Sequence, residues 1–269
     1  MIQAIIFDLD GVLVQTEKLK ALAYSKAVQV IRGLLEPDYR AGEAYREVVG
    51  ASRETTSRYV MNKLGLVEDL RPIMARYGVS KPEDALTAVR YEIYYDIIGD
   101  PQVIRDNQWP YAMAVLRTAR EFSCKTALTT LSKRKDVQHV IEALGIEDYL
   151  DAVLTAEDVT LGKPDPQIYL LAAERLGLPP EECLVLEDSV NGVKAGLAAG
   201  MEVVAIATPF TRGSLLSSGV IEDRWIAEPK TVPETVRLRI EVHNRSAHSQ
   251  ATSGHWTKNV GGDHSRPMS

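Results

Sequence analysis

The polar groups best suited to catalysis follow short apolar runs that are typical of buried strands. They are Asp8 and Asp10 in AIIFDLDG, Thr130 at the end of CKTALTT, Lys163 after DAVLT, and Glu187 with Asp188 at the end of CLVLE. The carboxyl ends of parallel strands meet at one edge of a sheet, where open α/β folds bind their ligands. We therefore expect these side chains to converge in a single crevice.

Carboxylates gathered in this way repel one another and lose their charge unless a cation is bound among them. Oxygen ligands of this kind suit Mg²⁺, which takes one or two carboxylates and retains water molecules that can be exchanged for substrate phosphate. Zinc is disfavoured because no cysteine or histidine accompanies the set. The pattern predicts a Mg²⁺ cofactor.

The elements that position these groups alternate between strand and helix. The first predicted strand covers residues 4–9, and from Glu17 apolar residues recur at helical spacing, with Thr16 as a possible N-cap. Residues 36–99 continue with helical patterns and contain no convincing strand. Further predicted strands are 124–130, 151–155, 183–187 and 202–206, and the helices between them are 111–121, 135–144, 166–176 and 192–199.

This alternation predicts an α/β fold, a doubly wound parallel sheet with a Rossmann-like core. The first strand belongs with the later ones, so the helical block is inserted into the core. We predict a discontinuous catalytic core of residues 1–15 and 101–241 and an all-helical cap domain of residues 16–100. Hinges for cap movement are expected near residues 14–16 and 99–101.

The segment 242–269 is rich in Ser, Gly, Asn, Thr and His and is predicted to be disordered, with the last ordered element ending near Glu241. A metal-binding cluster is the alternative interpretation of its histidines, although their spacing is irregular. These histidines are His243, His248, His255 and His264.

The 269 residues are 45% hydrophobic and 25% charged, with a formal net charge of −6, which excludes a small disulfide-stapled protein. Basic residues are scattered, so the sequence predicts no nucleic-acid partner. An apolar start interrupted by Asp8 does not resemble a signal peptide, and no window is long enough to predict a membrane span. Cys124 and Cys183 lie in or beside apolar runs, as expected of buried thiols in a cytoplasmic protein.

Taken in order, FDLDGV, LTTLSK, GKPDP and LEDSVNGVKAGLAAG resemble the four motifs of the haloacid dehalogenase-like superfamily of phosphohydrolases. The resemblance covers about residues 1–210. The inserted helices are similar to the small cap of the branch that contains phosphoglycolate phosphatases, sugar phosphatases and β-phosphoglucomutases. An aspartate at position 10 is typical of members that act on phosphate esters, so the implied substrate is a small phosphorylated metabolite.

The resemblance implies a role for each motif residue. Asp8 would be the nucleophile that forms an aspartyl-phosphate, and Asp10 the general acid and base. The metal would be bound by Asp8, the backbone carbonyl of Asp10, and Asp188, with Glu187 either a direct ligand or the holder of a metal-bound water. Thr130 and Lys163 would bind the phosphoryl oxygens, and Gly11 would bring backbone amides close to them.

Similarity to the mutases also implies which residues bind the part of the substrate beyond the transferring phosphoryl group. VVGASRETT resembles their cap loop, and Arg53 stands where an arginine grips a second phosphate, although a solvent-exposed arginine is an equal alternative. The other matching substrate-binding positions are Thr16, Ser132 and Lys133.

Three departures favour hydrolysis over mutase activity. Lys20 replaces a histidine, Val49 replaces a lysine of the cap loop, and Gln15 replaces Asp or Asn. Lys20 could itself reach phosphate, so a β-phosphoglucomutase-type enzyme remains the alternative. A non-catalytic ligand-binding protein is a third possibility, which the presence of Asp8, Asp10 and Lys163 disfavours. The sequence is compatible with a monomer or a homodimer.

Overall fold

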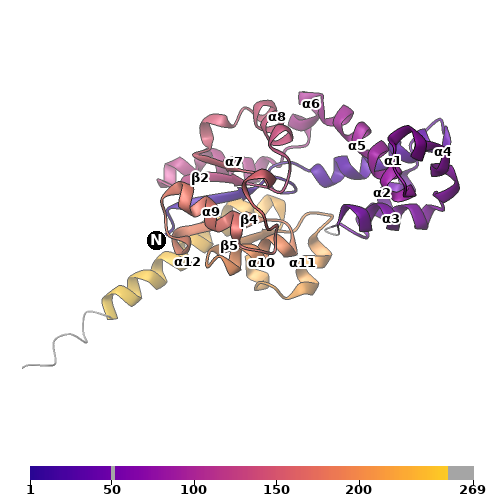
Figure 1. Cartoon of the computed structure of the whole chain (residues 1–269). Helices are drawn as coiled ribbons and strands as arrows, with labels where there is room; N and C mark the ends of the chain where they lie inside the picture. The colour runs from indigo at the N-terminus through magenta and orange to yellow at the C-terminus, as the bar shows by residue number, and fades with distance from the viewer. Residues whose placement is uncertain (50–51, 254–269) are drawn as a thin grey trace, which may run out of the picture.

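The structure is a computed structural model that describes residues 1–49 and 52–253. Its centre is a parallel sheet flanked by helices (Figure 1). The strand order is β3-β2-β1-β4-β5-β6. The strands are β1 Ala4–Asp8, β2 Lys125–Thr129, β3 Ala152–Leu154, β4 Cys183–Glu187, β5 Glu202–Ile206 and β6 Ile226–Ala227. The predicted doubly wound α/β fold is confirmed, and β6 is a short edge strand that the sequence analysis did not predict.

Each central strand is apolar throughout because helices cover both faces of the sheet. In β1, Ile5 and Phe7 belong to the hydrophobic cluster on one face, whereas Ala4 and Ile6 belong to the cluster on the other. The first face is covered by α7 Pro110–Thr118, α8 Arg134–Leu144 and α12 Val232–Ser253; the second is covered by α9 Gln167–Leu176, α10 Val190–Ala198 and α11 Arg212–Ser218.

The strand order places β1 between β2 and β4, so the chain winds away from β1 in both directions. Such a switch point opens a crevice at the carboxyl ends of the strands. Asp8 pairs with Thr129 of β2 at this end, and Leu186 of β4 pairs with Phe7. The predicted motif residues are therefore brought to one edge of the sheet.

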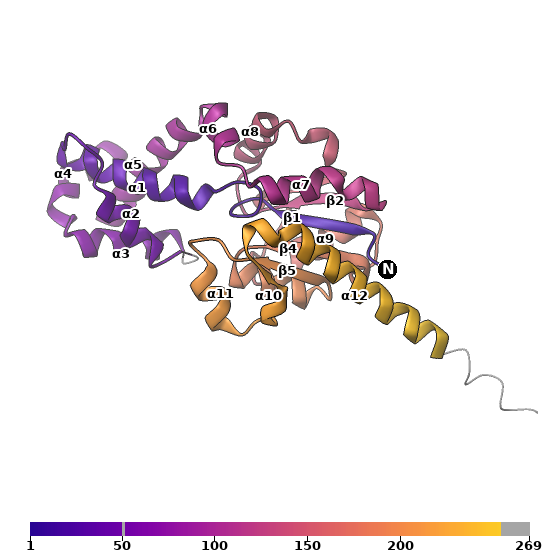
Figure 2. The same ribbon diagram turned by 180° about the vertical axis from the view of Figure 1, so that it is seen from behind.

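Between β1 and β2 the chain forms a block of helices beyond this edge (Figure 2). They are α1 Thr16–Arg32, α2 Tyr39–Arg46, α3 Arg53–Leu64, α4 Val67–Tyr77 and α5 Pro82–Ile98, followed by the short α6 Pro101–Asp106. The described part of residues 36–99 contains no strand, as predicted. The helices enclose a hydrophobic cluster whose fully buried members all lie between Ala21 and Val89.

Two boundaries differ from the sequence predictions. Thr16 is not the N-cap of α1 but its first residue, because Gln15 holds the cap position. Ordered structure does not end near Glu241: α12 continues to Ser253, because its extension contacts the sheet. The backbone N–H of Ile2 donates to Asn244 Oδ1 at 2.9 Å, and His243 Nδ1 lies 2.9 Å from Glu202 Oε1.

Residues 242–253 thus belong to a helix, whereas the sequence analysis predicts disorder for 242–269, and residues 254–269 lie outside the described residues. The alternative histidine cluster cannot be formed by His243 alone, which pairs with Glu202, and His255 and His264 are among the residues that the structure does not describe. Within the described ranges, no helix combines the length and the apolar character needed to cross a bilayer.

Candidate active site

The centre of the crevice is an ion-pair network between three buried side chains. Lys163 Nζ lies 2.6 Å from Asp8 Oδ1 and 2.5 Å from Glu187 Oε1. Asp8 comes from the end of β1, Glu187 from the end of β4, and Lys163 from the loop between β3 and α9. Burial lowers the pKa of the Lys163 ammonium, but the two carboxylates outweigh this and raise it well above its usual value. Lys163 is therefore a fixed positive charge beside Asp8.

Glu187 is held in place by several donors besides Lys163. The Tyr169 hydroxyl donates to Oε1 at 2.7 Å, and Oε2 accepts from the Ser189 hydroxyl at 3.1 Å and from the backbone N–H groups of Asp188 and Ser189. Ser189 also caps α10 through Gly192 N–H. These bonds fix the direction from which Glu187 faces Lys163.

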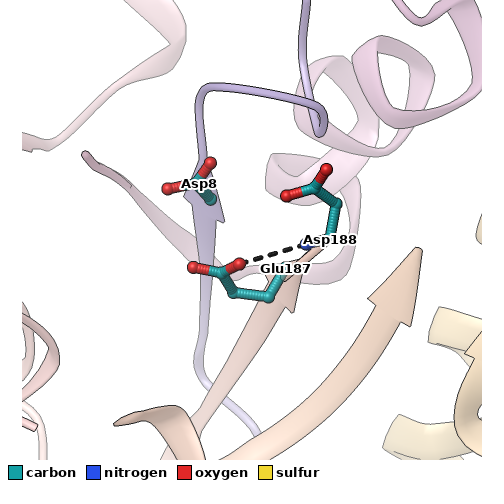
Figure 3. A group of neighbouring side chains, drawn as sticks. All are labelled: Asp8, Glu187 and Asp188. Atoms are coloured by element: carbon teal, nitrogen blue, oxygen red, sulfur yellow. Dashed lines mark hydrogen bonds between the residues drawn. The ribbon is translucent and has the colours of Figure 1, made fainter. Parts of the chain in front are cut away.

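Asp8, Glu187 and Asp188 form the acidic cluster drawn in Figure 3, and one oxygen of each lies within 4.8 Å of the others. All three are buried. Burial, reinforced by repulsion from neighbouring carboxylates, raises the pKa of Asp8 and of Asp188 well above the usual range, although Lys163 partly opposes this at Asp8. All of these ligand atoms are carboxylate oxygens, and the nearby positive charge does not balance them. The cluster therefore fits a hard divalent cation.

Asp10 lies apart from this cluster in a second network. Its Oδ2 accepts from the Ser132 hydroxyl at 2.8 Å and from the Thr130 hydroxyl at 3.3 Å, and Lys20 Nζ lies 3.3 Å from Oδ1. Burial alone would raise the pKa of Asp10, but Lys20 and hydroxyl donors that include Ser132 lower it to about 2. The two aspartates of FDLDGV are thus placed in opposite electrostatic environments.

Glycines permit two close approaches in this site. Gly11 has φ +82°, and a Cβ there would lie 2.0 Å from Asp188 Oδ2. A Cβ at Gly192 would lie 1.9 Å from Glu187 Cδ. Gly192 therefore leaves room for the acidic cluster itself.

Gly11→Ala is expected to lower kcat about 10²-fold, since the new methyl group displaces Asp188 from the cluster. Backbone strain at positive φ adds a loss of about 1–2 kcal/mol in unfolding free energy. Gly33→Ala is the matched control, because Gly33 has φ +63° with no atom within 4 Å of the new Cβ. Urea unfolding should show a similar loss of unfolding free energy from backbone strain in both variants. Steady-state kinetics should show a loss of activity only in Gly11→Ala.

Two adjoining cavities open at the site. The phosphoryl cavity, of about 450 Å³, is lined by Asp8, Asp10, Thr130, Lys163, Glu187 and Asp188 among others. The tyrosine cavity, of about 250 Å³, is lined by Thr16, Lys133, Arg90, Tyr24, Tyr45, Tyr91, Tyr94 and Tyr95 among others. Asp10, Glu17, Lys20, Arg53 and Ser132 line both. Gly11 lines neither cavity and acts through its approach to Asp188.

All of the predicted side chains thus lie at these two cavities, but several neighbours were not predicted. Tyr169 follows the helical apolar pattern of α9, so nothing in the sequence distinguishes it from a core residue. Glu17 receives hydrogen bonds from Lys20 at 2.8 Å and from the Tyr45 hydroxyl. Glu17 and Lys20 are three residues apart on one helix, and this spacing could have identified Glu17 as a partner of Lys20. Nothing in the sequence distinguishes Arg90 as a site residue.

The model of the haloacid dehalogenase-like hydrolases matches residues 2–200. Over 221 residues the chain is 28% identical to "Phosphorylated carbohydrates phosphatase" from Thermotoga maritima, covering 81% of this chain and 92% of that one. It is 31% identical over 214 residues to "Probable pseudouridine-5'-phosphatase" from Drosophila melanogaster, covering 76% and 81%.

Its fold is similar to a crystal structure of β-phosphoglucomutase from Clostridium difficile, with a TM-score of 0.61 and 21% identity over 92% of this chain and 99% of that one. At this identity the likeness concerns the fold alone. The family model, by contrast, matches well over half of the chain and includes all of the motif residues. The chain therefore belongs to the haloacid dehalogenase-like hydrolase family.

Proposed function

We propose that this hydrolase is a Mg²⁺-dependent phosphatase that cleaves a small phosphorylated metabolite, a sugar phosphate or a similar phosphomonoester, through an aspartyl-phosphate. The observation that carries the proposal is the position of Asp8, a buried carboxylate 2.6 Å from Lys163 at the wall of the phosphoryl cavity. The phosphatase names of relatives that cover most of this chain support it. The two buried cysteines, which form no disulfide, favour a cytoplasmic location.

Asp8, Asp188 and Glu187 would hold the Mg²⁺, since their oxygens lie within 4.8 Å of one another and lack balancing charge. When bound, the ion would neutralise charge on the phosphoryl oxygens and on Asp8. Lys163 would supply the second positive charge on the transferring group, and Thr130 a hydroxyl donor. Placing fixed charge in this way provides most of the acceleration in phosphoryl transfer.

The chain's own residues then divide the reaction into two displacements. Asp8 would form a bond to phosphorus while the ester P–O bond breaks, and the leaving oxygen would take a proton delivered through Asp10. Water would next attack phosphorus, giving its proton to Asp10 and releasing the Asp8 carboxylate and phosphate. Lys20, 3.3 Å from Asp10, favours the carboxylate form that the second step requires.

We also propose that residues 16–100 move as a cap on the core of residues 1–15 and 101–241. Support comes from the separate hydrophobic cluster of α1–α5 and from the short connections at residues 14–16 and 99–101. Opening would admit the ester, and closure would exclude bulk water. Nothing in the described surfaces requires more than one copy of the chain, and either a monomer or a homodimer is compatible with this motion.

The purified chain is expected to release phosphate from p-nitrophenyl phosphate when Mg²⁺ is present. In excess EDTA it is expected to lose about 95% or more of this activity. Added Mg²⁺ should restore it and should also raise the melting temperature, because the ion relieves repulsion in the acidic cluster. Absence of metal-dependent release at any pH near neutrality would favour a ligand-binding role instead.

A second assay separates hydrolysis from mutase activity. β-Glucose 1-phosphate with a trace of the 1,6-bisphosphate is expected to yield free phosphate faster than glucose 6-phosphate. A panel of phosphorylated metabolites then identifies the preferred ester. Faster formation of glucose 6-phosphate would replace the phosphatase assignment with the mutase.

A further inference from the structure

One aromatic side chain of the core packs into the cap. Phe210 lies in the loop between β5 and α11, and it contacts the hydrophobic cluster of α1–α5. Within the described residues it is the only member of that cluster from outside residues 16–100. The Arg46 guanidinium, at the end of α2, lies over the Phe210 ring, 4.7 Å from its centroid. This contact, the clasp, joins the core to the cap away from both connections of the chain.

The core fixes the loop that carries this ring. The Thr208 hydroxyl oxygen accepts hydrogen bonds from the backbone N–H groups of Phe210 and Thr211, at 3.3 and 3.2 Å, and lies 2.8 Å from the Thr211 hydroxyl. Both threonines are buried. The backbone N–H of Ala207 donates to the carbonyl of Ala227 in β6 at 2.8 Å, which ties the loop to the sheet. The backbone at Phe210 is thus held by core groups and not by the cap.

A contact between the cap and α8, which covers the opposite face of the sheet from α11, lies close to a hinge. His139 Nε2 on α8 lies 2.7 Å from the carbonyl oxygen of Ile98. Ile98 immediately precedes the connection at residues 99–101, so a rotation there would move it little. Arg46 is separated from both connections by helical segments. Cap opening would therefore break its contact with Phe210.

The clasp is joined to both cavities of the active site. On the core side, Thr211 follows Phe210 in the chain and lines the phosphoryl cavity. On the cap side, Tyr45 precedes Arg46, lines the tyrosine cavity and donates a hydrogen bond to Glu17. Separating the two partners of the clasp would therefore move one wall of the site away from the other.

We propose that Phe210 is a positioning residue: its ring receives Arg46 and holds the cap closed over the phosphoryl cavity. The inference rests on the proposed function, because it names the contact that sets the balance between the open and the closed cap. Two attractions act across the clasp, since the ring is partly withdrawn from water and its face attracts the guanidinium. The pair of Arg46 with Glu43, at 3.6 Å on the same helix, is exposed and adds little. Phe210 lines neither cavity and acts through the cap.

Energy transfer between dyes on the two domains measures this balance directly. The dyes are attached at Arg71→Cys on α4 and Lys194→Cys on α10, both exposed positions, whereas the two native cysteines are buried. In single-molecule measurements on the ligand-free protein, Phe210→Ala is expected to raise the ratio of open to closed molecules about 5- to 30-fold. Phe210→Leu and Arg46→Met should each have a smaller effect, because the first keeps apolar bulk and the second removes only the cation.

The effects of the two milder changes should not be independent. Arg46→Met combined with Phe210→Leu should raise the ratio by less than the product of the two single effects, because each already removes the cation–π contact. Leu216→Ala is the matched control, since Leu216 is an exposed apolar residue of α11 that lines neither cavity. An unchanged ratio in Phe210→Ala, an equal rise in Leu216→Ala, or a lower melting temperature as the only effect would contradict the proposal.

A cross-link tests whether the clasp must break during turnover. A short bis-methanethiosulfonate reagent joins the thiols of Arg46→Cys and Phe210→Cys through disulfides that can be reduced. The cross-linked protein is expected to hydrolyse p-nitrophenyl phosphate at least about tenfold more slowly than the same protein after reduction, because the closed cap does not admit the ester. Equal rates before and after reduction would contradict the proposal.

Failure of the clasp and failure of the phosphatase assignment give different results. If the wild type does not hydrolyse p-nitrophenyl phosphate, the proposed function fails, and the energy-transfer measurement still tests the clasp. If hydrolysis proceeds and the ratio of open to closed molecules is the same in the wild type and in Phe210→Ala, the phosphatase stands and the clasp does not.

Discussion

Asp8→Asn is expected to lower phosphate release by at least about 10⁴-fold, because the amide cannot form the bond to phosphorus on which both displacements of the proposed reaction would depend. The side chain keeps its size, so the substrate should still bind. The measurement is single-turnover and steady-state release of phosphate with Mg²⁺ present. Asp165→Asn is the control, since Asp165 lies in the GKPDP segment near the crevice but lines neither cavity.

The same variant has an expected signature in stability. Burial and the neighbouring carboxylates raise the pKa of Asp8, so its ionised form is disfavoured in the folded chain. This penalty grows as the pH rises above the unfolded value of about 3.8. Without Mg²⁺ at pH 7, Asp8→Asn should therefore melt no lower than the wild type, and its relative advantage should vanish at acid pH. Full activity, or unfolding at neutral pH, would contradict the assigned role.

Lys163→Met is the second change with a large expected effect. It removes the cation from Asp8 and Glu187, both of which stay buried. Leaving a buried charge uncompensated costs about 3–5 kcal/mol of unfolding free energy, and kcat should fall about 10³-fold because the phosphoryl group loses a fixed positive charge. Urea unfolding and phosphate release measure the two effects.

The stability loss should depend on pH and on metal in a defined direction. Asp8, whose pKa is already raised, takes up a proton more readily once Lys163 is absent, so the loss of unfolding free energy is smaller at pH 5 than at pH 8. Mg²⁺ should restore part of the stability but not the rate. Lys194→Met, at an exposed position on α10, is the control; an equal loss there, or a loss independent of pH, would exclude this explanation.

The sheet and its edge were predictable because the information is local. Residues such as Ile5 and Phe7 of β1 belong to short apolar runs that only a strand covered on both faces accommodates. Parallel strands joined by helices must then present their following residues at one edge, so Asp8, Lys163 and Glu187 could be assigned to a common site from their order alone. The helical insertion was predictable for the same reason, since its apolar periodicity changes after Thr16.

The end of the ordered chain could not be predicted in this way. Composition from residue 242 onward is typical of disorder, yet α12 continues because His243 and Asn244 find partners at Glu202 and Ile2. Those partners lie at the start of β5 and of the chain, far away in sequence. Contacts between residues so far apart in sequence cannot be predicted from local composition.

By itself, the sequence determined which groups could act on a phosphate ester, because their residue types and order along alternating strands are fixed by chemistry and by local periodicity. The tertiary structure alone decided how those groups are paired: Lys163 with Asp8 and Glu187, Lys20 with Asp10, and Arg90 with no carboxylate in the described chain. The physical reason is that charge, burial and pKa depend on distances of a few ångströms between elements far apart in sequence.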